Sequence, residues 1–307
     1  MCPAYLKLYD DGELDMRIDE LYSIIQSCVL CPRECRKNRL KGETGYCRSG
    51  ETLVVSAIHP HFGEEGPLVG PGRLAGAGGS GTIFLAGCNL GCVYCQNYDI
   101  SHLGEGRQIS PPELAEGMIK LQNLGCHNIN FVTPTHFVPQ LVKSLRVAIE
   151  NGLNIPIVYN CGGYESANTI RLLDGIVDIY MPDIKYSDSS KSEKYSDAPD
   201  YFQRCCEAVI GMHRQVGDLE LDGRGIARRG MLIRHLVLPG DAAGSEDVFK
   251  FIAEKLSRDT YVNIMFQYRP MFRAGEFKEL NRSPSLGEFQ KAIQMARDFG
   301  LHRGFTE

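Results

Sequence analysis

The chain has 307 residues, of which 43% are hydrophobic and 23% are charged, a composition expected of an ordinary globular protein. Its formal net charge of −5 excludes a strongly basic overall field, so nucleic acid is not the expected partner. No apolar run approaches the ~18 residues needed to span a bilayer, and the first residues lack the apolar stretch of a signal peptide. We therefore expect a cytoplasmic protein that does not enter a membrane.

The first 27 residues predict a short helical segment, because apolar side chains recur there at helical spacing. Residues 28–81 contain many turn-forming residues and end in a run dense in glycine. This composition predicts a small metal-stapled element followed by an irregular connection. We place a domain boundary after residue 81, with a cysteine-rich extension over 1–81 and the main domain over 82–307.

Four of the twelve cysteines lie close together in this extension, at Cys28, Cys31, Cys35 and Cys47. In a chain without a secretory signal, such a group favours metal binding over disulfides. Four thiolates suffice for a closed zinc site or for a second iron–sulfur cluster, and the spacing does not decide between them. The basic residues around them could offset the charge of such a site, or could form a solvated surface.

From residue 82, short apolar runs alternate with longer amphipathic segments. The apolar runs, predicted as strands, are 82–86, 128–132, 155–159, 177–181, 231–238 and 261–266. The amphipathic segments, predicted as helices, are 113–124, 136–150, 165–173, 199–216, 244–257 and 285–299. This alternation is typical of an α/β fold with a parallel sheet, either open or curved into a partial barrel.

Polar or ligand-type residues end every predicted strand, which helps to choose between these two architectures. An open sheet usually concentrates its site at one switch point, whereas a barrel gathers it from the ends of all strands. We therefore predict a partial (β/α)6 barrel that carries a small N-terminal metal-binding extension.

Three further cysteines, Cys88, Cys92 and Cys95, follow the first predicted strand with the spacing C-x3-C-x2-C. Closely spaced thiolates on one loop can ligate three corners of a four-iron cluster and leave the fourth iron open. An open coordination position is what a catalytic metal site needs. Zinc is the alternative, with His102 as the nearest candidate for a fourth ligand.

This motif, placed after the first strand of a β/α series, resembles the signature of the radical S-adenosylmethionine superfamily. The chain most resembles its pyruvate formate-lyase activating-enzyme-like branch, particularly members with an extra N-terminal cysteine-rich element. The stretches that carry the resemblance are 28–35, 81–88, 159–165, 178–186 and 234–240.

The resemblance implies a six-stranded partial barrel with a 4Fe-4S cluster whose unique iron is chelated by S-adenosylmethionine. One electron, from a flavodoxin or ferredoxin-type donor, then cleaves the cofactor to a 5′-deoxyadenosyl radical that abstracts hydrogen. In activating enzymes the hydrogen comes from a glycine of a partner, a glycyl-radical enzyme. The alternatives are a radical enzyme acting on a small molecule, RNA or a protein side chain, and a non-catalytic zinc protein.

The resemblance also implies which residues meet S-adenosylmethionine. Tyr94 matches an aromatic position that packs near the adenine. The superfamily's Gly-Gly-Glu stretch, which meets the amino group, is replaced here by residues 133–136. Thr133 or Thr135 is therefore expected to substitute for the usual glutamate.

Four polar residues at later strand ends complete this set. Asp183 and Lys185 match an Asp-x-Lys pair that lies near the cofactor in the activating enzymes. Asn160 stands where those enzymes often carry an aspartate near the cofactor carboxylate. Arg234 matches their strand-five arginine, a fitting charge partner for that carboxylate.

Overall fold

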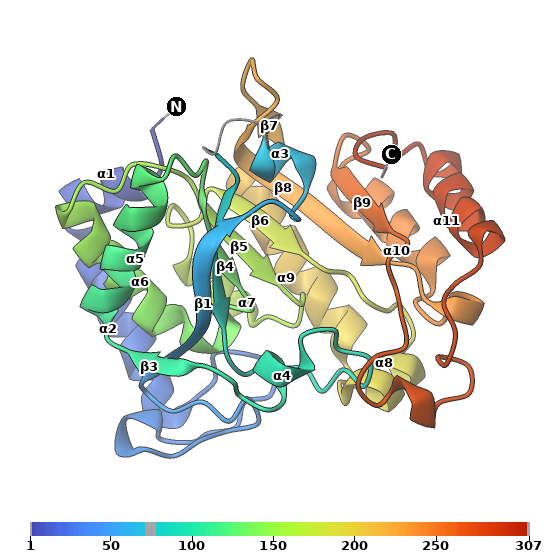
Figure 1. Ribbon diagram of the computed structural model, residues 1–307, viewed down its shortest axis with the longest axis horizontal. Coiled ribbons are helices and arrows are strands. Elements are labelled where there is room, and N and C mark those ends of the chain that lie inside the picture. Colours follow the sequence, from blue (N-terminus) through green and yellow to red (C-terminus); the bar gives the residue numbers. More distant parts are fainter. Residues whose placement is uncertain (1, 71–77, 306–307) are drawn as a thin grey trace.

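The computed structural model describes residues 2–70 and 78–305, and its centre is a nine-stranded sheet. Six strands run parallel, in the order β2-β4-β5-β6-β8-β9. They are β2 (Ser80–Leu85), β4 (Ile129–Val132), β5 (Ile157–Cys161), β6 (Ile179–Pro182), β8 (Ala227–Leu236) and β9 (Tyr261–Met265). The α/β partial barrel with six parallel strands is thus confirmed, and helices surround the sheet (Figure 1).

The connecting helices lie where their amphipathic patterns predict them. They are α5 (Pro111–Asn123), α6 (Val138–Glu150), α7 (Ala167–Leu172), α9 (Tyr201–Val216), α10 (Ser245–Phe251) and α11 (Leu286–Asp298). The start of α5 shows why: Ser110 and Glu113 form a capping box in which each side chain accepts the other's backbone N–H. The predicted helix over 244–257 ends in one π-helical turn, Ile252–Leu256.

The N-terminal helical segment consists of α1 (Tyr5–Asp10) and α2 (Glu13–Ile24). Gly12 separates the two helices, because its left-handed conformation, with a φ of 74°, interrupts the α-helix. Residues with a side chain rarely adopt this conformation. The backbone N–H of Ala4 donates to Asp178 Oδ1 at 2.9 Å, which ties this segment to the start of β6.

Residues 28–81 were expected to be irregular after the metal-stapled element, and this expectation is wrong for β1 (Leu53–His61). β1 pairs antiparallel with β2, and its first three residues pair with β3 (Arg107–Ile109). Pro60 weakens the strand signal in the sequence. It is tolerated because β3 covers only the start of β1, so the missing N–H lies on an open edge. The boundary after residue 81 stays a prediction.

Four short elements had no clear pattern in the sequence: α3 (Gly66–Val69), α4 (Tyr98–Ser101), α8 (Ser189–Ser196) and β7 (Glu220–Leu221). α3 and α4 lie near opposite ends of the sheet (Figure 1). Leu68 of α3 packs against the inward-facing Val158, Ile179 and Leu232. α3 therefore closes the N-terminal end of the barrel and leaves the C-terminal end open.

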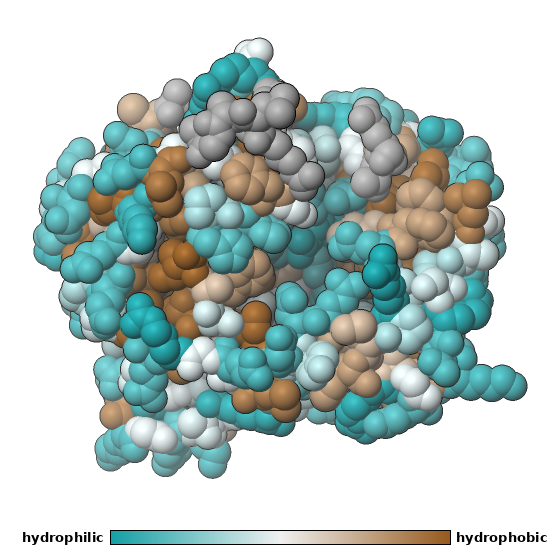
Figure 2. Space-filling view, in the orientation of Figure 1, coloured by the Kyte–Doolittle hydropathy of each residue, from teal (hydrophilic) through white to brown (hydrophobic). Residues whose placement is uncertain are grey.

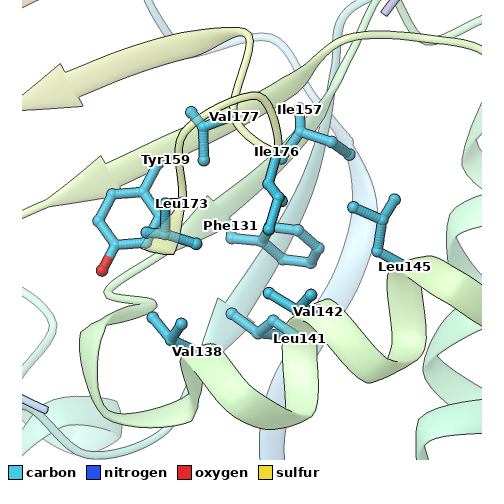
Figure 3. A pocket seen from close by; sticks show the side chains of 10 residues that line it. All are labelled: Phe131, Val138, Leu141, Val142, Leu145, Ile157, Tyr159, Leu173, Ile176 and Val177. Carbon is cyan, nitrogen blue, oxygen red and sulfur yellow. The ribbon is translucent and has the colours of Figure 1, made fainter. Parts of the chain in front are cut away.

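The outer core is formed where α6 packs on the sheet. Val138, Leu141, Val142 and Leu145 of this helix point toward Phe131 and its neighbours across a small apolar cavity of about 20 Å³ (Figure 3). This packing holds the middle strands rigid beneath the site. Within residues 2–70 and 78–305, no helix is long and apolar enough to cross a membrane.

Candidate active site

A cavity of about 250 Å³ opens at the C-terminal ends of the parallel strands. It is lined by residues on or just after β2, β4, β5, β6, β8 and β9. This convergence follows from the topology, because parallel strands of a barrel present all their carboxyl ends to one face. The cavity unites Cys88, Cys92, Cys95, Tyr94, Thr133, Asn160, Asp183, Lys185 and Arg234.

The three cysteines of the C-x3-C-x2-C loop each have a polar neighbour at sulfur. The backbone N–H of Leu90 donates to Cys88 Sγ at 3.4 Å, and the Ser196 hydroxyl donates to Cys92 Sγ at 3.0 Å. Cys95 Sγ lies 3.1 Å from Ser101 Oγ. Hydrogen bonds of this kind stabilise thiolates and tune clusters bound by them.

Burial has the opposite effect on these thiols. It raises the pKa values of Cys88 and Cys92, and the positive charge of Lys185 offsets part of this effect. A buried thiol becomes a thiolate most readily when a cation binds it. The loop is therefore suited to hold a positively charged metal cluster.

The loop itself is held by neighbouring backbone groups. Asn89 donates to the carbonyl of Tyr164 at 2.5 Å, Gly91 N–H to Ser196 at 3.1 Å, and Val93 N–H to Tyr195 at 2.9 Å. These bonds come from segments after β5 and in α8. The position of the cysteines thus depends on residues some 70 to 100 positions later in the chain.

Arg234 is the centre of a charged network that lines the cavity. Its Nε donates to Asp183 Oδ1 at 2.7 Å and its Nη2 to Asn160 Oδ1 at 2.7 Å. Lys185 Nζ donates to Asp183 Oδ2 at 2.5 Å. Burial opposes ionisation of Asp183, but the two cations hold its pKa below the usual value. The structure therefore brings all four predicted residues into one hydrogen-bonded group.

Glu64 and Glu65, just before α3, were not predicted to belong to this group. Their carboxylates lie 3.9 and 3.7 Å from Arg234 Nη1, and both side chains are buried. Burial raises the pKa of Glu64 to about 7, with Arg234 acting against the rise. No motif or spacing marks these acids, since they reach Arg234 only through the fold of β1 and α3.

The two candidate threonines have different surroundings. Thr133 lines the cavity in a left-handed conformation, with a φ of 59°. Thr135 is fully buried, and its hydroxyl donates to Glu165 Oε1 at 2.7 Å, while Tyr159 donates to Oε2 at 3.0 Å. Burial raises the pKa of Glu165 to about 7. Thr133 is thus exposed to the cavity, and Thr135 is not among its lining residues.

Aromatic and sulfur-bearing side chains complete the lining. Tyr94 is buried with its ring edge-to-face against Tyr186 and Tyr268, at centroid distances of 6.4 and 5.6 Å. Cys161, a buried residue at the end of β5, also lines the cavity. Tyr94 and Tyr268 thus give the cavity an aromatic wall.

Cys28, Cys31, Cys35 and Cys47 line a second, smaller hollow together with His136. Among the described residues, no three His, Cys, Asp or Glu side chains stand at the spacing that a single metal ion requires. The fold thus brings the cysteines of each group together, but neither group, as described, has the geometry of a closed site for a single metal ion.

Comparison with known proteins agrees with this geometry. The family model described as the radical SAM superfamily matches residues 82–213. The uncharacterized protein MJ0674 of Methanocaldococcus jannaschii is 33% identical over 298 residues, which cover 94% of this chain and 79% of that protein. This chain belongs to the radical SAM superfamily.

Two further matches are more distant. The pyruvate formate-lyase-activating enzyme of Staphylococcus aureus is 22% identical over 189 residues, covering 58% of this chain and 70% of that enzyme. The crystal structure of HydG, described as a maturase of the FeFe-hydrogenase, aligns with a TM-score of 0.52 at 12% identity. The alignment covers 75% of this chain but only 51% of HydG, and it shows a likeness of fold.

Radical SAM enzymes use a 4Fe-4S cluster and S-adenosylmethionine, and these are the cofactors of this chain. The cavity fits both groups. Three thiols with polar partners can hold a cluster that keeps one position open. The lining also carries two cations, Arg234 and Lys185, against one carboxylate, Asp183. Glu64 and Glu65 share Arg234, so the two cations offer the carboxylate of S-adenosylmethionine hydrogen-bond donors rather than an excess of positive charge.

Arg234→Met should destabilise the fold by about 3–5 kcal/mol, because it leaves buried acids without their cation. Chemical denaturation measures this loss. The control is Arg171→Met, since Arg171 pairs with Glu20 at the exposed surface, where an ion pair contributes about 1 kcal/mol or less. Equal stability of the two variants would contradict the buried network.

Glu165→Gln should become more stable relative to the wild type as the pH rises from about 4.5 to 7. The folded protein keeps Glu165 protonated over this window while the unfolded chain does not, so wild-type stability falls with rising pH. The difference should reach about 3 kcal/mol at most, since one pKa unit corresponds to about 1.4 kcal/mol.

Unfolding of both proteins at several pH values checks this expectation. Glu193→Gln, at an exposed position, is the surface control. A constant stability difference between Glu165→Gln and wild type across this window would show that Glu165 is ionised in the folded protein.

Proposed function

We propose that this radical SAM enzyme is an activating enzyme, which abstracts a hydrogen atom from a glycine of a partner protein. The observation that carries the proposal is the three-cysteine cavity with an apolar rim at its mouth. The relation to the pyruvate formate-lyase-activating enzyme supports the choice of substrate class. A flavodoxin or ferredoxin-type protein is the proposed electron donor.

Cys88, Cys92 and Cys95 are the proposed cluster ligands. When bound, the cluster and S-adenosylmethionine supply a 5′-deoxyadenosyl radical for hydrogen abstraction. The protein's own contribution is to hold the three thiolates in place through Leu90, Ser196 and neighbouring backbone bonds.

The charged network orients S-adenosylmethionine in this proposal. Arg234 and Lys185 attract its carboxylate, and Asn160 and Asp183 offer acceptors for its amino group. Asp183, Asn160 and the two glutamates fix the guanidinium of Arg234 in advance, which lowers the entropy lost on binding.

Two further side chains complete this proposed cofactor site. Thr133, rather than Thr135, is the proposed substitute for the usual glutamate, since only Thr133 lines the cavity. Tyr94 is the proposed neighbour of the adenine, because it belongs to the aromatic wall.

The rim of the cavity favours a macromolecular substrate. Gln96 donates to the carbonyl of Gln267 at 3.2 Å, and Arg273 N–H to that of Val93 at 2.8 Å, so the segment after β9 adjoins the cysteine loop. On this segment Met271 and Phe272 are exposed. Figure 2 shows hydrophobic side chains on this face, over α4 and the segment after β9. Exposed apolar groups around a reactive cavity are typical of a protein-binding surface.

Replacing Cys88, Cys92 and Cys95 by Ala should abolish reductive cleavage of S-adenosylmethionine. Anaerobically reconstituted protein is reduced with dithionite, and 5′-deoxyadenosine is measured by mass spectrometry. Cys206→Ala, on α9 outside the cavity lining, is the matched control and should keep the activity. Production of 5′-deoxyadenosine by the triple variant would remove these cysteines from the reaction.

Met271→Glu should lower radical transfer to a partner at least tenfold while cleavage of S-adenosylmethionine without partner stays unchanged. Proteins captured anaerobically on the wild type are incubated with reduced enzyme and cofactor, and a glycyl radical is sought by electron paramagnetic resonance. The control is Leu286→Glu, at an exposed position on α11. A radical signal unaffected by Met271→Glu would refute the rim as the docking surface. Its absence with every captured protein would refute the activating role.

A further inference from the structure

The segment that carries Cys28, Cys31, Cys35 and Cys47 folds back on itself through its own backbone. Cys28 N–H donates to the carbonyl of Lys37 at 2.9 Å, and Arg36 N–H donates to that of Cys28 at 3.0 Å. The four thiols thereby line one hollow, which is half-buried. The structure describes this entire segment, and none of the four cysteines is in a disulfide.

Backbone N–H groups act on three of these sulfurs. Burial raises the pKa of the Cys31 and Cys47 thiols, and the backbone N–H groups of Arg33 and Ser49, each two residues further along, act against this rise. Cys35 Sγ accepts the N–H of Tyr46 at 3.3 Å. The same two-residue arrangement joins Leu90 N–H to Cys88 in the catalytic loop. The hollow thus repeats a backbone arrangement that presents sulfur as a thiolate ligand.

Backbone strain is concentrated around the same thiols. Glu34 and Arg36 flank Cys35, Arg48 follows Cys47, and all three have positive φ values of 39°, 57° and 59°. Gly45 is also required, because a Cβ there would lie 2.8 Å from Cys35 Sγ. Such conformations are unfavourable for residues with a side chain and persist when further bonds hold them. Metal–thiolate bonds would supply that restraint.

Two arginines place positive charge beside the thiols. Arg39 is 1% exposed, and its guanidinium donates to the carbonyls of Gly50 and His136 rather than to a carboxylate. Arg33, also lining the hollow, donates to the carbonyl of Asn89 at 2.9 Å. Arg33 also lies 3.8 Å from Asp197 Oδ2, whereas the hydrogen bonds of Arg39 go to carbonyl groups, so Arg39 is the cation better placed to offset a tetrathiolate centre.

We propose that Cys28, Cys31, Cys35 and Cys47 bind a second metal centre through four thiolates, closed to substrate, which braces the catalytic loop. Zinc and a 4Fe-4S cluster share this ligand chemistry. Zinc would draw the sulfurs to about 3.8 Å from one another, as a tetrahedron with Zn–S bonds of ~2.3 Å requires. A cluster would leave them farther apart.

The bracing role follows from direct contact with residues 87–91. Tyr46 lies against Gly91, where a Cβ would be 2.3 Å from the phenolic oxygen, and the carbonyl of Cys47 lies against Gly87 in the same manner, at 2.7 Å. The bond from Arg33 to Asn89 reaches the same loop. Loss of the metal would therefore loosen the loop that carries Cys88.

The test uses the full chain in which Cys88, Cys92 and Cys95 are all replaced by Ala, so it does not depend on the proposed reaction. After anaerobic purification, elemental analysis should find about one zinc per chain, or about four irons with visible cluster absorbance. Cys35→Ser in this background should lose that metal, and Cys206→Ser should keep it. Either metal supports the proposal.

Three results would overturn the proposal: a folded triple variant without metal, disulfides among the four cysteines in mass spectra, or unchanged metal in Cys35→Ser. Gly45→Ala is a milder second variant if Cys35→Ser fails to fold. Its methyl group would press on Cys35 Sγ and should speed metal loss to a chelator at least tenfold. Removing the metal from the triple variant should also lower its melting temperature, and an unchanged value would refute the bracing role.

Discussion

The partly buried pair of Arg234 and Asp183 joins the strands that build the site. The two residues also form a backbone bridge between the end of β6 and β8, so main chain and side chain fix the same contact. Through Asn160 and Lys185 the pair organises three strand ends on one wall of the cavity. Leaving one of these charges without its partner would lower the stability of the fold, so the paired arrangement of these side chains is favoured.

Another part of the cavity lining depends on a loop rather than on a strand. Residues 87–95 carry three cysteines, and their position is set by hydrogen bonds to the segment after β5 and to α8. On its outer side the same loop meets the N-terminal cysteine-rich segment through Arg33 and Tyr46. Residues 87–95 thus contact both the barrel and the N-terminal segment, and both sets of contacts restrict the movement of this loop.

Membership of the radical SAM superfamily accounts for the cofactors but leaves the substrate open. The related proteins differ in what their names say they do, and the likeness to HydG concerns the fold. Two regions lie beside the cysteine loop: the segment with the exposed Met271 and Phe272, and the cysteine-rich segment. These two regions are where its own specificity should be sought.

The sequence alone determined the features that local chemistry controls. Alternation of apolar and amphipathic segments predicts six parallel strands and their helices because hydrophobic periodicity is a local property. The convergence of Asn160, Asp183 and Arg234 also followed, since parallel strands bring their carboxyl ends together. Only the tertiary structure placed β1 on the sheet edge, put Glu64 and Glu65 beside Arg234, and separated Thr133 from Thr135. Each of these depends on contacts between segments far apart in the chain, which no local pattern records.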